Sequence, residues 1–399
     1  MAGVVGATVF AIAASTGLYF VFLGLLTVPW FQNQAIYLHN VKLTWGKDVN
    51  LPEQWGFLHN QITPFNLKTP DGETLHAWHI LPLEVYRRHE KGLLEEPSGQ
   101  IFDIEKRRSF DILKHDPNAL LVVYLHGAAG TLGSGHRPQS YRAISAMAPD
   151  RIHIMSVDYR GFGTSTGSPS EQGLVTDALT LADWAMNTAG IPPEKIVIFS
   201  QSLGTAVAIS LMRQLASRPE PIYLRGLVMV APFSDVKTLT ATYKVAGTIP
   251  ILSPLARFPV LMDFFARFIE TKFPSKDTLA EFVRHCQASA SSKAQYHVTA
   301  IHAKDDYDIP WSHSEELYWT AVNAAENITR NEVELDEIKH NDRKSLGAGG
   351  WVVEKDYTKG TLRQHILDHG LHDWTMGYPA VSMAIWKAFL SAKAIALDS

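Results

Sequence analysis

The stretch KIVIFSQSLGTAVAISLM, residues 195–212, decides the fold. An apolar run with strand character ends at Ser200, and an apolar pattern with helical spacing begins shortly after it. A residue on such a strand-to-helix corner needs small neighbours two positions before and after it, because strand and helix approach closely there. Ser202 has Ser200 and Gly204 at those positions. Ser200 would have the branched Ile198 instead, so the sequence predicts that Ser202 is the corner residue.

Further strands are predicted on both sides of this stretch. Short apolar runs alternate with segments of helical periodicity, which is typical of a parallel sheet covered on both faces. The runs are LLVVYLHG (120–127), IHIMSVDYRG (152–161), GLVMVAPFSD (226–235) and YHVTAIHAKDD (296–306). Before them, FNLKTPDGETLHAWHIL (65–81) predicts a hairpin around a Pro-Asp-Gly turn. The polar stretch from residue 84 to 118 predicts a solvated helical excursion.

The corner serine has candidate partners for nucleophilic catalysis. Ligands bind at the carboxyl ends of the strands in a sheet of this kind. A serine hydroxyl there needs a base to take its proton and an acid to orient the base, in the chain order Ser, Asp or Glu, His. The downstream candidates are Asp305, Asp306, Asp308, His365, His369 and His372. The order fits, and the spacing alone leaves the choice among them open; a simple polar turn at Ser202 is the alternative.

The full set of motifs resembles a known family. YLHGAAG, VDYRGFGTSTGSPSEQGLVTDA, FSQSLGTAVA, VAPF and HAKDDYDIP are similar to the α/β-hydrolase-domain serine hydrolases, and most similar to their membrane-anchored lipase branch, which cleaves monoacylglycerols and lysophosphatidylserine. The resemblance covers about residues 63 to 393. It implies the α/β-hydrolase fold, a mostly parallel central sheet with helices on both faces, together with an inserted helical cap and an N-terminal transmembrane helix.

The resemblance also implies roles for single residues. The family acid belongs to an Asp-x-x-Val/Ile-Pro pattern, which selects Asp306, and the family histidine follows a Gly-x step, which selects His372. Ser200 stands where the family's Gly-x-Ser-x-Gly motif usually has its first glycine. The expected triad is therefore Ser202, Asp306 and His372.

An oxyanion needs donors that are already aimed at it. The Leu203 N–H follows the nucleophile, and the Ala128 N–H of the HGAAG loop is the expected second donor, with the choice of loop residue left open. No metal or cofactor is expected. His365 and His369, four residues apart, would suit a metal on a helix, but no cysteine or carboxylate-rich partner set accompanies them.

The N-terminal segment predicts a membrane anchor. No charged residue occurs from Ala2 to Val28, and the apolar run exceeds the roughly 20 residues that cross a bilayer core. A secretory signal would have a basic start and a shorter apolar stretch. Trp30 and Phe31 follow, as expected where aromatic rings settle at a membrane interface. We therefore expect an anchor over residues 1–40 and a hydrolase domain over 41–399.

An apolar excursion predicts the cap. It covers about residues 234–295 and includes IPILSPLARFPVLMDFFARFIETKFP, an aromatic and aliphatic stripe. The stripe fits either an acyl tunnel and bilayer contact or ordinary packing of cap on core. An anchor beside an apolar cap favours a lipid ester as substrate.

Composition excludes some classes of protein. A net charge of −4 gives no basic field for nucleic-acid binding, so no nucleic acid is expected as a partner. The single cysteine, Cys286, excludes an intramolecular disulfide. Neither observation bears on the oligomeric state.

The expected function is hydrolysis of carboxylic esters of single-chain lipids, monoacylglycerol or lysophospholipid such as lysophosphatidylserine, through an acyl-enzyme. A non-enzymatic receptor or scaffold with the same fold, or an esterase for small soluble esters, are the alternatives. Together with the resemblance, the anchor predicts a single-pass protein of the endoplasmic reticulum membrane. The lumenal side is favoured for the catalytic domain. The sequon Asn327-Ile328-Thr329 would carry a glycan only on that side.

Overall fold

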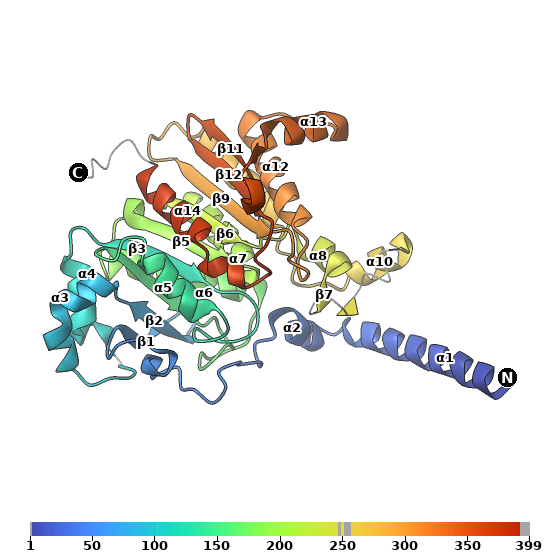
Figure 1. The fold of residues 1–399 in the computed structure, drawn as a ribbon, viewed down its shortest axis with the longest axis horizontal. Coiled ribbons are helices and arrows are strands. Elements are labelled where there is room, and N and C mark those ends of the chain that lie inside the picture. The colour runs from blue at the N-terminus through green and yellow to red at the C-terminus, as the bar shows by residue number, and fades with distance from the viewer. Residues whose placement is uncertain (1, 102, 246–248, 251–256, 392–399) are drawn as a thin grey trace.

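The protein is built on one large twisted sheet (Figure 1). The computed structural model describes residues 2–101, 103–245, 249–250 and 257–391. The sheet has ten strands in the order β1-β2-β4-β3-β5-β6-β9-β12-β11-β10. The strands are β1 (Ile62–Lys68), β2 (Thr74–Ile80), β3 (Leu120–Leu125), β4 (Ile152–Val157), β5 (Ile196–Gln201), β6 (Gly226–Val230), β9 (Tyr296–Ala303), β10 (Lys344–Ser345), β11 (Trp351–Tyr357) and β12 (Gly360–Leu367). A separate small sheet pairs β7 (Lys244–Val245) with β8 (Ile249–Pro250).

The centre of the sheet is parallel and its edges are antiparallel. The five apolar runs of the sequence are β3, β4, β5, β6 and β9, all parallel to their neighbours within this group, as predicted. The predicted hairpin is the antiparallel pair β1 and β2. The strands of the other edge were not predicted from the sequence. There β12 pairs parallel with β9, and β11 pairs antiparallel with β12. Buried and half-buried residues alternate over most of β12, and the second half of β11 is half-buried or exposed, so neither strand contains the continuous apolar run that identified the central strands.

Helices cover both faces of the sheet. One face carries α6, α7, α11 and α12, and the other carries α5 and α14. The helices are α1 (Ala2–Leu25), α2 (Pro29–Tyr37), α3 (Leu83–Leu94), α4 (Arg108–His115), α5 (Arg137–Ser145), α6 (Glu171–Asn187), α7 (Leu203–Ala216), α8 (Val236–Thr242), α10 (Pro259–Ala266), α11 (Ser275–Ala288), α12 (Ser312–Glu326), α13 (Glu332–Asp342) and α14 (Pro379–Leu390). The predicted excursion at 84–118 contains α3 and α4.

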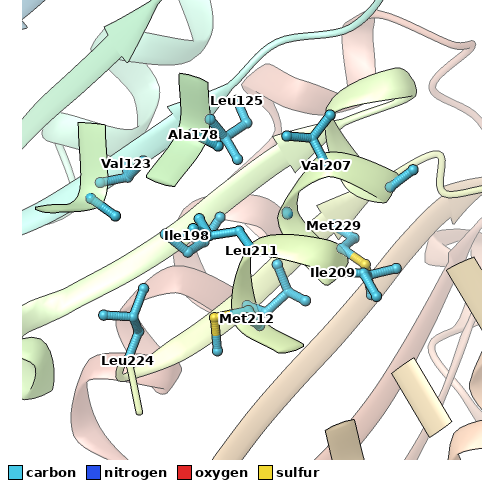
Figure 2. Packing of buried hydrophobic residues seen from close by; sticks show 14 of the residues in the cluster. Val123, Leu125, Ala178, Ile198, Val207, Ile209, Leu211, Met212, Leu224 and Met229 are labelled. Atoms are coloured by element: carbon cyan, nitrogen blue, oxygen red, sulfur yellow. The ribbon is translucent and has the colours of Figure 1, made fainter. Parts of the chain in front are cut away.

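Strand β5 shows how the two cores are formed. Ile198 faces α7 and packs among Val207 and Leu211, whereas the next residue, Phe199, belongs to the core on the α14 side (Figure 2). Both side chains are fully buried. Burying a side chain of this size contributes about 1.5–3 kcal/mol, so the strand that leads into Ser202 is firmly held on both faces.

Helix α1 projects from the body of the protein (Figure 1). Its segment Val4–Leu25 is long and apolar enough to cross a membrane by length and composition, with a mean hydropathy of 1.9. Little of it is buried, unlike a core helix of a soluble protein; a signal sequence near an N-terminus has the same length and composition. The helix is thus a candidate membrane span.

The segment predicted as the cap contains two kinds of structure. Helix α11 packs against α7 and α12 and so lies in the layer that covers the sheet. Helices α8 and α10 instead contribute residues to a cavity beside Ser202. Residues 246–248 and 251–256 of the predicted cap lie outside the described residues.

Candidate active site

Ser202 occupies the turn between β5 and α7. Its backbone has φ 52° and ψ −121°, a conformation that L-residues rarely adopt and that costs of order 1–3 kcal/mol. The Ser202 N–H donates to Val230 O at 3.0 Å, which ties the turn to the end of β6. On the other side, Thr205 donates its N–H and its hydroxyl to Ser202 O. The strained turn is therefore fixed from both sides.

The neighbours of Ser202 show why small residues are needed. A Cβ atom at Gly204 would lie 2.2 Å from Leu125 O, which no real Cβ tolerates. Ser200 is fully buried in β5, and its hydroxyl has no hydrogen-bond partner among the described residues. Ser200 is therefore a buried spacer of the strand.

Asp306 lies just beyond β9 and is bound by four donors. Its Oδ1 accepts the N–H groups of Asp308 at 3.0 Å and Ile309 at 2.9 Å. Its Oδ2 lies 2.8 Å from His372 Nδ1 and 3.2 Å from His302 Nε2. Burial alone raises the pKa of Asp306, but the hydrogen bonds from His302 and His372 outweigh it and hold that pKa well below its usual value. The carboxylate therefore stays charged.

His372 is placed by a neighbouring aspartate as well as by Asp306. Asp305 Oδ1 accepts the N–H groups of Gly370 and Leu371, both at 2.9 Å, and so positions the loop before His372. Burial alone lowers the pKa of His372, but its hydrogen bond with Asp306 and the charge of that carboxylate raise it to about 9. With Nδ1 held by Asp306, Nε2 is the nitrogen left for proton transfer.

Ser202 and His372 line the same cavity. Over the described part of the chain, no hydrogen bond joins the Ser202 hydroxyl to His372. Such bonds are often long in a substrate-free site and tighten when substrate binds. The structure thus places Ser202, Asp306 and His372 at one edge of the sheet.

The other two histidines do not form the helical metal site considered above. His365 lies on strand β12, and His369 lies in the loop beyond it, so the two do not share a helix face. The ring of His369 is 85% exposed and lies 3.4 Å from Asp305. No group of three or more His, Cys, Asp or Glu side chains could hold a metal ion within the residues described.

The two expected oxyanion donors flank Ser202. Leu203 is the first residue of α7, so its N–H has no acceptor within the helix. In the described ranges the Ala128 N–H also donates no hydrogen bond. Both residues line the same cavity as Ser202.

Two functional residues were missed from the sequence. Arg137 is buried and donates to the carbonyl oxygens of Gly127 at 3.1 Å, Ala129 at 2.8 Å and Thr131 at 2.6 Å, and so braces the loop that contains Ala128. His302 stands four residues before Asp306 and supports its carboxylate. The four-residue spacing between His302 and Asp306 was the only sequence signal for His302. Nothing in the sequence signalled the role of Arg137.

Charged side chains also brace the loops that lie further from Ser202. Asp158 accepts the Leu132 N–H at 2.9 Å and lies 3.5 Å from His126 Nε2. Burial raises the pKa of Asp158 to about 7. Arg160 pairs with Asp177 and Asp71, which joins the loop after β4 to α6 and to the β1–β2 turn.

Two cavities meet at Ser202. The apolar one, about 1100 Å³ with its open mouth included, is bounded by α1, α2, α8 and α10; its lining residues include Leu23, Leu26, Ile36, Leu239 and Phe265. The other has a more polar lining that includes His136, Gln201, His372 and Asp373. An ester with its carbonyl at Ser202 can therefore place an apolar group on one side and a polar group on the other.

The sheet order, the turn at Ser202 and its charged partners define a serine hydrolase of the α/β-hydrolase fold. Residues 116–334 match the profile of the Hydrolase_4 family, described as serine aminopeptidase, S33, and since this is more than half of the chain, the chain belongs to that family. A solved α/β hydrolase from Vibrio vulnificus shares the fold, with a TM-score of 0.50, 16% identity and coverage of 79% of this chain and 92% of that one.

The chain is also similar in sequence to proteins of the ABHD12 group. The chain is 28% identical to lysophosphatidylserine lipase ABHD12 of Danio rerio over 73% of this chain and 66% of the relative, and 28% identical to that of Mus musculus over 73% and 63%. It is 31% identical to human protein ABHD12B over 53% of this chain and 52% of the relative. The chain thus spans slightly less than two thirds of these lipases' own length.

The turn geometry predicts different roles for the two serines. Replacing Ser202→Ala should abolish labelling by a fluorophosphonate probe, because only its hydroxyl lies on the exposed turn. Ser200→Ala removes a buried hydroxyl without a partner and should leave labelling unchanged. Gel fluorescence of the two purified variants measures this, with circular dichroism as a check of folding. Equal loss in both variants would contradict the assignment.

The contacts of the histidines predict which of them is the base. His372→Ala should lower kcat for an ester by about 10⁴-fold or more, the scale seen when a serine triad loses its base. His369→Ala removes an exposed ring and should change kcat by less than about tenfold, as is typical outside the catalytic unit. Steady-state hydrolysis of a chromogenic ester compares them, and the reverse ranking would exclude His372.

The raised pKa of His372 predicts an alkaline profile. The base acts in its neutral form, so the labelling rate should rise with pH through a pKa above the ordinary 6.5 of histidine and near 9. In Asp306→Asn the charge that raises this pKa is lost, so the rise should move to lower pH while the rate falls by about 10⁴-fold. A rise at or below pH 6.5 in the unmodified protein would refute this reasoning.

Proposed function

We propose that this chain is a membrane-anchored serine hydrolase that cleaves the carboxylic ester of a single-chain lipid, a monoacylglycerol or a lysophospholipid, through an acyl-enzyme. The observation that carries the proposal is the position of Ser202 at the junction of an apolar cavity and a polar one. One acyl chain fits the first cavity, and a hydrated head group fits the second.

The mechanism follows from the contacts of the three residues. Ser202 attacks the ester carbonyl while His372 Nε2 takes its proton, and Asp306 stabilises the imidazolium through Nδ1. The oxyanion accepts the N–H groups of Leu203 and Ala128. His372 then gives the proton to the departing alcohol, and a water molecule, deprotonated by the same nitrogen, releases the fatty acid and restores Ser202.

The substrate class has two independent supports. The apolar cavity is lined almost entirely by aliphatic and aromatic residues, and each methylene buried there contributes about 0.8 kcal/mol. The relatives named lysophosphatidylserine lipase support a lysophospholipid with a polar head group. The alternative of a small soluble ester would leave most of the apolar cavity without a ligand.

A non-enzymatic receptor or scaffold is the second alternative. Strained backbone at a turn such as that of Ser202 persists only where the surrounding structure enforces it, and such residues cluster at active sites. The charged pair of Asp306 and His372 beside that turn therefore favours chemistry over simple binding.

The proposed location is a single span in the endoplasmic reticulum membrane. Residues 1–40 would be the anchor and 41–399 the hydrolase domain. Of the segment predicted as the cap, about 234–295, α8 and α10 would cover the site, because α11 lies in the layer over the sheet. The side chain of Asn327 is exposed at the end of α12, so its sequon is accessible for a glycan if the domain is lumenal.

A chain-length series tests the proposal. Purified protein in detergent should hydrolyse long-chain monoacylglycerols and lysophosphatidylserine faster than their acetyl counterparts, with kcat/KM rising along the series as methylenes enter the apolar cavity. Ser202→Ala is the control for contaminating activity. Rates that are highest for acetyl esters and negligible for long chains would defeat the lipid proposal and favour the small soluble ester.

A further inference from the structure

The apolar cavity extends from Ser202 to the end of the membrane-span candidate. At the catalytic end it is lined by Ala128, Ser202 and Leu203. At the far end it is lined by Leu23, Leu26 and Thr27, where α1 finishes, and by Phe265 of α10. A helix expected only to tether the protein thus contributes directly to the cavity that holds the acyl chain.

The last turns of α1 have two different faces. Leu23 is completely buried, packs against Met262 of α10, and has Leu26 and Phe265 beside it. The adjacent Phe22 and Leu25 are 37% and 41% exposed. Leu23, Leu26 and Thr27 are spaced three and four residues apart, as on one face of a helix. This face lines the cavity, and the opposite face is free to contact lipid.

Helix α2 holds this end of α1 in place. The buried Gln32 side chain donates to Phe268 O and accepts the Glu270 N–H at 3.1 Å, which joins α2 to the segment after α10. The hydroxyls of Tyr37 and Thr271 lie 3.0 Å apart. These hydrogen bonds therefore attach the segment from Leu23 to Tyr37, which forms the cavity wall, to the rest of the hydrolase.

Several apolar residues are exposed on α10 and at its start, next to this wall. Phe258, Val260 and Phe264 are 59%, 82% and 49% exposed, and α10 lies on the side of the molecule from which α1 projects (Figure 1). Exposed apolar residues beside a spanning helix would lie at the membrane surface. The open cavity and this surface thus share one side of the molecule.

We infer that the end of α1 is a wall of the acyl site, and that the acyl chain enters this site from the bilayer that holds the anchor, on the side of the molecule where α1 and α10 lie. The inference rests on the proposed function and deepens it: Leu23, Leu26 and Phe265 set the chain length that the site accepts. The substrate is then a single-chain lipid already inserted in the enzyme's own membrane.

Kinetics of two matched variants test the wall. In full-length protein reconstituted in phosphatidylcholine vesicles, Leu26→Trp should lower kcat/KM for oleoyl lysophosphatidylserine by about tenfold or more, the effect of excluding about two methylenes from the cavity. It should lower kcat/KM for 4-nitrophenyl butyrate by a smaller factor, because a four-carbon acyl chain fills less of the cavity. Leu25→Trp, on the exposed face one residue away, should alter neither value. Equal effects of the two variants, or equal effects on the two esters, would overturn the inference.

A chemical protection experiment measures whether a bound chain covers position 26, and it remains informative if Leu26→Trp disturbs folding. Leu26→Cys and Leu25→Cys introduce a thiol in a protein whose own Cys286 is buried, with its pKa raised to about 12 by that burial. Reaction of Ser202 with a long-chain fluorophosphonate forms a phosphonate ester and releases fluoride. This product should slow N-ethylmaleimide labelling of Leu26→Cys by about tenfold or more, as expected for a thiol covered by a buried chain. A methyl fluorophosphonate should not slow it, and Leu25→Cys should stay reactive throughout.

The outcomes separate this inference from the proposed function. Absence of fluorophosphonate reaction at Ser202 would defeat the hydrolase itself. Reaction at Ser202 with equal maleimide reactivity at both cysteines would leave the hydrolase standing and exclude α1 as the wall of its acyl site.

Discussion

The left-handed backbone of Ser202 is the constraint on which the rest of the site depends. It is held because β5 is buried on both faces, because the Ser202 N–H is bound to Val230 O, and because Gly204 lets α7 approach the end of β3. The same turn exposes the hydroxyl and begins α7 at Leu203, whose N–H has no acceptor within the helix. The proposed nucleophile and one of the two proposed oxyanion donors are thus placed by one local conformation.

Strain of the same kind recurs where other strands end. Ala129, Ala231 and Leu371 also have positive φ, at 56°, 51° and 52°, and they follow β3, β6 and β12. Partners fix each of them: Tyr37 O accepts the Ala129 N–H, Ile301 O accepts the Ala231 N–H, and Asp305 accepts the Leu371 N–H. The surrounding packed structure therefore stabilises the strained residues at the carboxyl edge of the sheet.

The central strands and the Ser202 corner could be predicted because their signals are local. A continuous apolar run and the size of two neighbouring residues are both visible in the chain. The edge strands β11 and β12 gave no such run, and the roles of Arg137 and His302 depend on which carbonyl or carboxylate the fold brings beside them. Choosing Asp306 and His372 among their neighbours required a family resemblance, since spacing in the chain does not show that Asp305 instead binds the loop before His372.

The N-terminal segment and the hydrolase are one mechanical unit in this structure. The loop that contains Ala128 is bound from this segment, because Tyr37 O and Val41 O accept the N–H groups of Ala129 and Gly130. The same segment continues back through Gln32 to the wall formed by Leu26. A displacement of α1 relative to the body would therefore act both on the cavity lining at Leu26 and on the loop that contains Ala128. For the proposed anchor, the position in the membrane and the shape of the active site are then set together, which separate anchor and catalytic modules joined by a loose linker could not achieve.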